Sequence, residues 1–264
     1  MSGEAKALLV DISECIGCRA CMEGCMQAHD FTGDAFEVEK LSTTAYTVVE
    51  EKGDYFVRKL CMHCVTPSCV SVCPVAALQK TDTGPVVYDS SRCMGCRYCI
   101  QACPFEVPRY EWDSSIPSVT KCDMCVERQE RGEMPACAEA CPVGATVFGT
   151  REELLEEAHR RIDESPDKYY PHVYGETEAG GTSTLFLSPV SFEELGFRTD
   201  LGDIPLPVLT QQALERIPGI VTVGGSVLLA TWWITHRREE VARAETIISR
   251  STKNPEEETD DERR

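Results

Sequence analysis

The chain has 264 residues, and its 44 acidic side chains outnumber the 26 basic ones, giving a formal net charge of −18. This balance argues against nucleic acid as a partner, because proteins that neutralise phosphates carry basic surfaces. The length allows one or two domains. Its 16 cysteines do not indicate a disulfide scaffold, since the chain is long and cysteines two or three residues apart have poor disulfide geometry.

The cysteines form four groups of four, each ending in C-x3-C, with none left over. In chain order the groups are Cys15, Cys18, Cys21 and Cys25; Cys61, Cys64, Cys69 and Cys73; Cys93, Cys96, Cys99 and Cys103; and Cys122, Cys125, Cys137 and Cys141. The first and third match the bacterial ferredoxin spacing C-x2-C-x2-C-x3-C. Three cysteines of a loop reach three irons of one cube, and we expect the fourth to start a helix and ligate a neighbouring cube. The pattern predicts four [4Fe–4S] clusters.

Zinc is the alternative metal, because C-x2-C pairs often bind it. A zinc ribbon uses two separated pairs and does not need C-x2-C-x2-C-x3-C followed by proline. Proline follows three of the groups, at Pro74, Pro104 and Pro142. A structural zinc protein would be colourless and free of iron.

Several basic residues beside the groups would partly compensate cluster charge, or are ordinary surface charges. They are Arg19, Lys59, Arg92, Arg97, Lys121 and Arg128.

The N-terminus lacks the long apolar run of a signal peptide and a twin arginine, so we expect either a cytoplasmic protein or export with a partner that carries the signal. Residues 7–12 read as the first strand of a ferredoxin-like fold. Apolar and polar residues alternate on both sides of Lys52-Gly53-Asp54, which predicts a β-hairpin. Residues 84–89 predict a short strand, and the gap between Cys125 and Cys137 predicts a polar surface loop.

A helix follows the last group. Thr150 and Glu153 form a predicted capping box, an apolar stripe follows at helical spacing, and Pro166 ends the helix. Residues 182–190 then predict a strand that packs either on the cluster domain or on a partner subunit.

Residues 217–235 form a run of 19 residues without charge, which is long enough to cross the hydrocarbon core of a membrane. Trp232 and Trp233 lie near one end, as in an aromatic belt. A buried core helix is the alternative. Arginines follow the span, so the positive-inside rule predicts a cytoplasmic C-terminus and clusters on the periplasmic or extracytoplasmic face of the inner membrane.

These signals predict an α+β fold with two ferredoxin-like 2×[4Fe–4S] modules and a single C-terminal transmembrane helix. We expect the four-cluster domain over residues 1–149, a helix and loop-rich extension over 150–210, the transmembrane helix over 211–238 and a charged tail over 239–264. The last ten residues, PEEETDDERR, predict disorder.

The four groups in this order, the motif VGATVFGTREELLEEA, the segment YGETEAGGTSTLFLSPVSFEELG and the C-terminal span resemble one family. It comprises the iron–sulfur β subunit of respiratory formate dehydrogenase and the similar four-cluster subunit of membrane-bound [NiFe] hydrogenase. The cysteine motifs alone are shared with electron-transfer subunits of other molybdopterin enzymes.

The resemblance implies that the first group pairs with the fourth and the second with the third. The implied ligand sets are Cys15, Cys18, Cys21 and Cys141; Cys122, Cys125, Cys137 and Cys25; Cys61, Cys64, Cys69 and Cys103; and Cys93, Cys96, Cys99 and Cys73. It also implies a catalytic molybdenum, tungsten or [NiFe] subunit and an integral membrane quinone-reactive or cytochrome b subunit as partners.

The sequence therefore predicts a non-catalytic electron-transfer subunit that relays electrons between a formate dehydrogenase-like enzyme and a membrane quinone site. The same role in a hydrogenase or another respiratory reductase is the alternative. A soluble polyferredoxin-type carrier, with residues 217–235 buried, is a further one.

Overall fold

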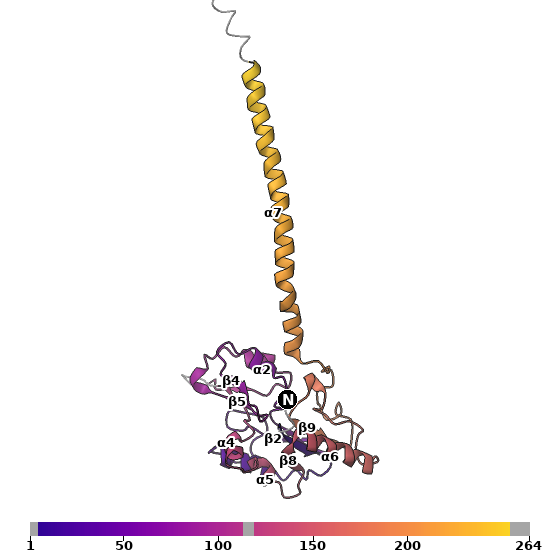
Figure 1. The fold of residues 1–264 in the computed structure, drawn as a ribbon. Coiled ribbons are helices and arrows are strands. Elements are labelled where there is room, and N and C mark those ends of the chain that lie inside the picture. Colours follow the sequence, from indigo (N-terminus) through magenta and orange to yellow (C-terminus); the bar gives the residue numbers. More distant parts are fainter. Residues whose placement is uncertain (1–4, 113–118, 254–264) are drawn as a thin grey trace, which may run out of the picture. The chain divides into compact units, whose positions relative to one another are not determined.

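The computed structural model describes residues 5–112 and 119–253, with side chains described up to residue 250. It divides into two compact units, Met1–Leu209 and Thr210–Arg264. Each is considered by itself below (Figure 1).

A three-stranded sheet joins distant parts of the first unit, with the order β8 (Thr146–Thr150), β1 (Lys6–Asp11), β9 (Thr184–Leu187). β1 runs antiparallel to β8 and parallel to β9, so it is the central strand. This confirms the strand predicted at residues 7–12. It also shows that the strand predicted at residues 182–190 packs on the chain's own cluster domain.

The two faces of β1 contribute to two different cores, because alternate residues of a strand point to opposite sides. Leu8 and Val10 belong to the core that contains the cysteine Cys137. Leu9 packs instead with Leu154 and Ala158. The sheet therefore separates the core that contains Cys137 from the core that contains Leu154 and Ala158.

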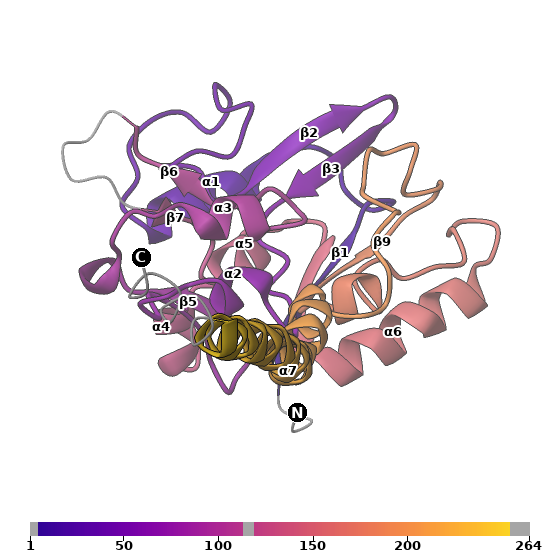
Figure 2. The same cartoon turned by 90° about the horizontal axis from the view of Figure 1, so that it is seen from above.

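Three hairpins surround the cysteine groups: β2 (Val48–Lys52) with β3 (Tyr55–Lys59), β4 (Leu78–Lys80) with β5 (Val86–Tyr88), and β6 (Arg109–Tyr110) with β7 (Val119–Thr120). Gly53 turns the first hairpin at a φ of 59°, which glycine adopts without steric cost. The hairpin predicted around this residue is confirmed, and Figure 2 shows it extending along one side of the unit.

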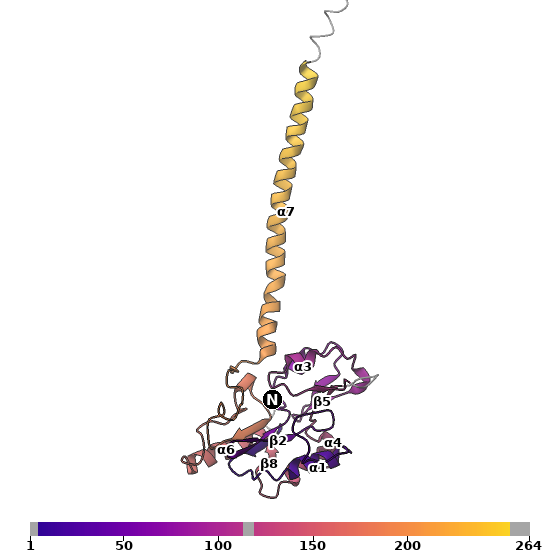
Figure 3. The same cartoon turned by 180° about the vertical axis from the view of Figure 1, so that it is seen from behind.

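Five short helices lie among the cysteine groups: α1 (Ala20–Ala28), α2 (Ser68–Ser71), α3 (Tyr98–Ala102), α4 (Val126–Glu130) and α5 (Ala136–Glu139). α1 packs on α5, and α2 packs on α3. Figures 1 and 3 show α2 and α3 at one end of the unit and α1, α4 and α5 at the other. Helices from the first and fourth groups therefore form one module, and helices from the second and third groups form the other.

The expectation that the fourth cysteine of each group starts a helix is wrong. Arg19 and Arg97, directly after the second cysteines of their groups, adopt left-handed φ values of 59° and 63° and turn the chain into α1 and α3. The helix therefore begins before the third cysteine. In α1 the third and fourth cysteines, Cys21 and Cys25, are four residues apart, so one helical turn places both on the same face.

The surface loop predicted between Cys125 and Cys137 is also wrong in its first half, which forms α4. Cys125 adopts a left-handed φ of 51° and starts this helix in the same way as Arg19 starts α1. Residues 126–130 are mostly polar, and so short a segment has no apolar periodicity that would predict a helix.

The extension contains α6 (Arg151–Glu164), which begins with the predicted capping box. The Thr150 hydroxyl accepts from the Glu153 N–H at 3.3 Å, and the Glu153 carboxylate accepts from the Thr150 N–H at 3.2 Å. α6 contacts β1 and β8. Two 3-10 turns, Ser90–Arg92 and Glu178–Gly180, complete the regular structure described in this unit.

The helix α7 (Leu206–Lys253) contains the predicted span at residues 217–235 and continues through residues 239–253 of the predicted charged tail. It is long and apolar enough to cross a membrane. The ten C-terminal residues for which disorder is predicted lie outside the described residues.

Candidate iron–sulfur sites

All sixteen cysteines are free, although many lie only two to four residues apart. Six are buried, and Cys18 alone among the sixteen is exposed. The thiols gather in four places, and each place takes members from two different groups of the sequence.

The first gathering contains Cys15, Cys18, Cys21 and Cys141, which line one cavity together with Arg58. Burial raises the pKa of the Cys15 thiol, and the neighbouring charges of Cys141 and Cys18 act in the same direction. Gly17 shapes this loop at a φ of 70°, where a Cβ atom would lie 2.5 Å from the Phe56 ring.

The second gathering contains Cys122, Cys125, Cys137 and Cys25. Burial, together with the charges of Cys137 and Cys25, raises the pKa of Cys125 to about 12. Burial also raises the pKa of Cys122, with Cys25 the strongest of its charged neighbours.

The third gathering contains Cys61, Cys64, Cys69 and Cys103. Burial raises the pKa of Cys69 to about 12, and the charges of Cys61 and Cys103 contribute. The pKa of Cys64 is raised by burial and by its neighbours Cys61, Cys103 and Cys69.

The fourth gathering contains Cys93, Cys96, Cys99 and Cys73. Burial raises the pKa of Cys99 to about 11, and the charges of Cys93, Cys96 and Cys73 add to this effect. Burial acts in the same direction on Cys73, but backbone N–H groups of residues 75–78 outweigh it and lower the pKa of this thiol.

These sites fit cationic iron–sulfur cubes. Burial, and after it the mutual repulsion of crowded thiolates, raises the pKa of Cys15, Cys69, Cys99 and Cys125, and a bound cation would replace the protons. Backbone N–H groups already donate to sulfur, at 3.2 Å from Ala77 to Cys73, 3.3 Å from Met124 to Cys122 and 3.4 Å from Gly95 to Cys93. Soft sulfur ligands supported by N–H donors are the ligation that Fe–S clusters use.

Two cations that the sequence did not single out lie among these sites, the buried Arg58 and the partly buried Lys80. Arg58 donates to the hydroxyls of Thr47 and Thr146, at 2.8 and 3.0 Å. Burial opposes its charge, but Cys137 and Cys21 outweigh burial and raise the pKa of Arg58. Lys80 is the second, and burial lowers its pKa to about 8.

Of the six basic residues that the sequence singled out, Lys121 alone is buried, and it donates to the carbonyl of Cys122 at 2.8 Å. The others lie at the surface: Arg19 and Arg97 stack on the aromatic rings of Phe36 and Trp112, and Lys59, Arg92 and Arg128 form ion pairs with Glu50, Asp89 and Glu139. Nothing local in the sequence separates these positions, because burial is decided by packing.

His29 is a third residue near the thiols that the sequence did not single out. Its ring contacts the Cys25 carbonyl at 2.9 Å and the Asp123 carboxylate at 3.1 Å. Burial opposes a positive charge on the ring, but these hydrogen bonds raise the pKa of His29 to about 11. His29 follows Cys25 by four residues at the C-terminus of α1, and this helical spacing is the feature of the sequence that could have predicted its contact with Cys25.

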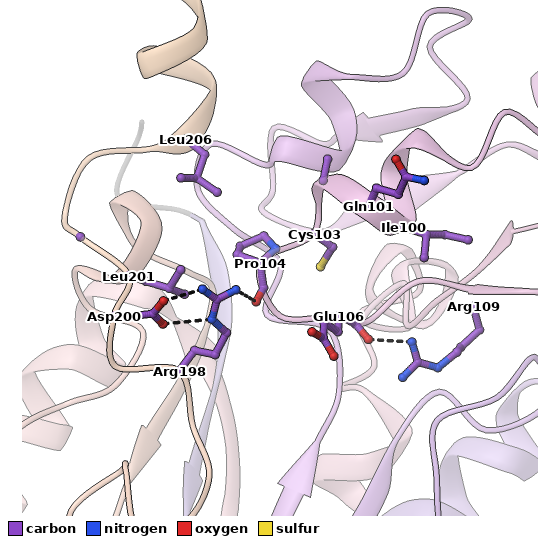
Figure 4. A pocket seen from close by; sticks show the side chains of 12 residues that line it. Ile100, Gln101, Cys103, Pro104, Glu106, Arg109, Arg198, Asp200, Leu201 and Leu206 are labelled. Atoms are coloured by element: carbon purple, nitrogen blue, oxygen red, sulfur yellow. Dashed lines mark hydrogen bonds and ion pairs between the residues drawn. The ribbon is translucent and has the colours of Figure 1, made fainter.

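A pocket of about 690 Å³ opens beside Cys103 (Figure 4). Its charged residues are already engaged: Arg198 pairs with Asp200 at 2.6 Å, and Arg109 donates to the Glu106 carbonyl at 2.7 Å.

Residues 53–151 match the family model of the 4Fe-4S dicluster domain. The chain is 37% identical over 258 residues to a protein of Nitratidesulfovibrio vulgaris, covering 92% of this chain and 70% of the relative. It is 39% identical over 233 residues to the hydrogenase-2 operon protein HybA of Escherichia coli, covering 71% of each chain. It is 37% identical over 199 residues to the iron-sulfur subunit of the nitrate-inducible formate dehydrogenase of Escherichia coli, covering 69% of this chain and 67% of the relative.

These comparisons confirm the resemblance that the cysteine groups and the segments after them indicated. Because the matched family is a 4Fe-4S dicluster domain and the thiol sites fit such clusters, the chain carries several [4Fe–4S] clusters. The chain belongs to the family of iron–sulfur subunits that includes those of formate dehydrogenase and the hydrogenase-2 operon protein.

Proposed function

We propose that this chain is a non-catalytic subunit that relays single electrons through four [4Fe–4S] clusters inside an oxidoreductase complex. The observation that carries the proposal is the gathering of its sixteen thiols at four places.

The proposed ligands of each cube are three cysteines of one group and the last cysteine of another. The sets are Cys15, Cys18, Cys21 with Cys141; Cys122, Cys125, Cys137 with Cys25; Cys61, Cys64, Cys69 with Cys103; and Cys93, Cys96, Cys99 with Cys73. The electrostatic neighbours described above support this assignment, as does the packing of α1 on α5 and of α2 on α3. A ferredoxin fold exchanges its fourth ligands in the same way.

Electrostatic interactions between neighbouring sets support a linear order for the relay. The charge of Cys137 raises the pKa of Cys21, that of Cys61 raises the pKa of Cys122, and that of Cys99 raises the pKa of Cys69. These pairs link the first set to the second, the second to the third and the third to the fourth. Cys18, in the first set, is the exposed thiol, and Cys93 and Cys96 in the last set are partly exposed. An electron therefore has a surface to enter at one end and a surface to leave at the other.

The proposed partners are a catalytic subunit at one end of the relay and an integral membrane quinone-reactive or cytochrome b subunit at the other. A formate dehydrogenase-like molybdenum or tungsten enzyme is one candidate for the catalytic partner. A [NiFe] hydrogenase is the second, and the longer match to the hydrogenase-2 operon protein favours it.

The proposed location is the inner membrane, with α7 as a single span. Its 18-residue windows reach a mean hydropathy of 1.6, and arginines 237, 238, 243 and 250 follow the apolar stretch. By the positive-inside rule the C-terminus is cytoplasmic and the clusters lie on the extracytoplasmic side.

The first test is metal analysis of the native complex, extracted in mild detergent through a tag on this chain. We expect about 16 iron atoms for each copy of this chain, in addition to those of its partners. Molybdenum or tungsten in the complex identifies a formate dehydrogenase-like partner, and nickel without either identifies a hydrogenase. Zinc in place of iron would refute the proposal.

The second test uses two matched variants, Cys25→Ala and Cys141→Ala, each of which removes a C-terminal member of its group. We expect Cys25→Ala to alter the electron paramagnetic resonance signal of the cube held by Cys122, Cys125 and Cys137. We expect Cys141→Ala to alter the signal of the cube held by Cys15, Cys18 and Cys21. The reverse outcome would refute the ligand assignment without affecting the relay.

A further inference from the structure

His63 lies between two proposed ligands, Cys61 and Cys64, and its side chain is completely buried. Its Nδ1 accepts a hydrogen bond from the backbone N–H of Val86, at 2.9 Å. A backbone N–H can only donate, so Nδ1 carries no proton. The proton of the neutral ring is therefore on Nε2.

The Nε2 atom of His63 is buried and has no hydrogen-bond partner among the residues that the structure describes. Leaving a buried donor without an acceptor costs about 1–3 kcal/mol, and native proteins rarely tolerate it. The acceptor is therefore expected to be a group that none of the described residues supplies.

The backbone of His63 adopts an energetically unfavourable conformation. Its φ is 46°, in the left-handed region that residues other than glycine rarely adopt. Its carbonyl is fixed from two sides, by the Lys80 ammonium at 3.0 Å and by the Ser183 N–H at 3.2 Å. Three separate segments thus keep the ring next to the loop that carries Cys61 and Cys64.

We propose that the Nε2–H group of His63 donates a hydrogen bond to a sulfur of the cube held by Cys61, Cys64, Cys69 and Cys103. This inference rests on the ligand set proposed above. A sulfur atom of the cube satisfies the buried donor, in a site too dry for water to compete. Hydrogen bonds to cluster sulfur stabilise the more negative, reduced state, so His63 raises the reduction potential of this one cube.

The test compares two variants in the holo complex, His63→Asn and His63→Gln. Asparagine places an acceptor near the position of Nδ1 and tolerates a left-handed φ, but it lacks the distal donor. Glutamine places its amide N–H near the position of Nε2 and so keeps the donor.

The expected readouts are spectroscopic. In reduced complex containing 15N-histidine, pulsed electron paramagnetic resonance should detect a 15N coupling to the cube that Cys103→Ser also perturbs. His63→Asn should abolish this coupling and, at the wild-type midpoint potential, change the reduced-to-oxidised ratio of that cube roughly tenfold toward the oxidised form. His63→Gln should retain most of the reduced fraction, and the control His29→Gln, beside Cys25, should retain the coupling.

Full iron content with no 15N coupling, or with an unchanged ratio in His63→Asn, would overturn the inference and leave the relay intact. A shift of the cube perturbed by Cys99→Ser in place of that perturbed by Cys103→Ser would overturn it as well. Iron missing from the wild-type complex would instead refute the proposed function. If the complex with His63→Asn does not assemble, the labelled wild-type complex and His29→Gln still test the inference. A 15N coupling absent from the wild type contradicts it.

Discussion

The carboxylate of Asp11 accepts a hydrogen bond from the hydroxyl of Tyr169 at 2.8 Å, and both side chains are buried. The same carboxylate pairs with Arg161 of α6 at 3.1 Å. Asp11 ends β1, just before the first cysteine group, whereas Arg161 and Tyr169 follow the last one. The extension is thus fastened to the strand that leads into the first cluster site.

Removing this carboxylate should destabilise the cluster unit. We expect Asp11→Ala to lower the free energy of unfolding by about 2–3 kcal/mol, because the buried Tyr169 hydroxyl loses its acceptor and Arg161 keeps only Glu157 as a partner. Tyr169→Phe should cost only about 1–2 kcal/mol. Thermal loss of the iron–sulfur absorbance of the holo complex would rank the variants. Glu164→Ala, which removes an exposed partner of Arg160, is the control. An equal loss of stability in the three variants would show that Asp11 does not fasten the extension to β1.

Gly175 should not tolerate a side chain. Its φ is 98°, and a Cβ atom there would lie 2.5 Å from the Thr182 hydroxyl and 2.6 Å from the Thr184 carbonyl. Gly196 has a φ of 79° but nothing within 4 Å, so it separates backbone strain from the clash. We expect Gly196→Ala to cost about 1 kcal/mol and Gly175→Ala about 3 kcal/mol or more, measured by the same thermal assay. Similar losses of stability in the two variants would show that backbone strain, and not the clash at Gly175, sets the cost.

Arg58 should raise the potentials of two cubes at once, because it is close to both Cys21 and Cys137. Reduction adds negative charge, which a buried cation stabilises. Arg58→Leu should therefore lower the potentials of both clusters by roughly 50–100 mV. Redox-titrated electron paramagnetic resonance measures this shift.

The neighbouring Lys59 provides the control for this change. Its side chain is 46% exposed and pairs with Glu50, so solvent screens its charge. Lys59→Leu should shift the potentials much less. Equal shifts in the two variants would show that net charge, rather than buried charge, sets the potentials.

An arginine in the middle of the apolar stretch of α7 should weaken membrane association. Leu228→Arg should cost about 2.5–3.5 kcal/mol of insertion free energy. The fraction of chain that stays in membranes after an alkaline carbonate wash should fall, whereas Gln212→Arg, before the apolar stretch, should leave it unchanged. Retention of Leu228→Arg at the wild-type level would show that α7 does not lie in lipid.

The sequence alone determined the features that depend on short spacings. Cysteines two to four residues apart indicated the cluster chemistry, and Thr150 with Glu153 indicated where α6 begins. Lys52-Gly53-Asp54 indicated the turn between β2 and β3. Each of these features depends on residues that lie close together in the sequence, so the local sequence is enough to predict it.

Only the tertiary structure decided which distant residues meet. β9 joins β1 across more than 170 residues of chain, with Leu8 paired to Thr184, and no local pattern specifies that register. Arg58 and Lys59 are adjacent cations in the same strand, yet Arg58 is buried between thiols and Lys59 faces solvent. His63 reads as one residue of a cysteine loop, and only the packing of β5 against it fixes its tautomer. Burial and partner choice arise when remote segments pack together, which is why the residues that surround the clusters emerged only from the fold.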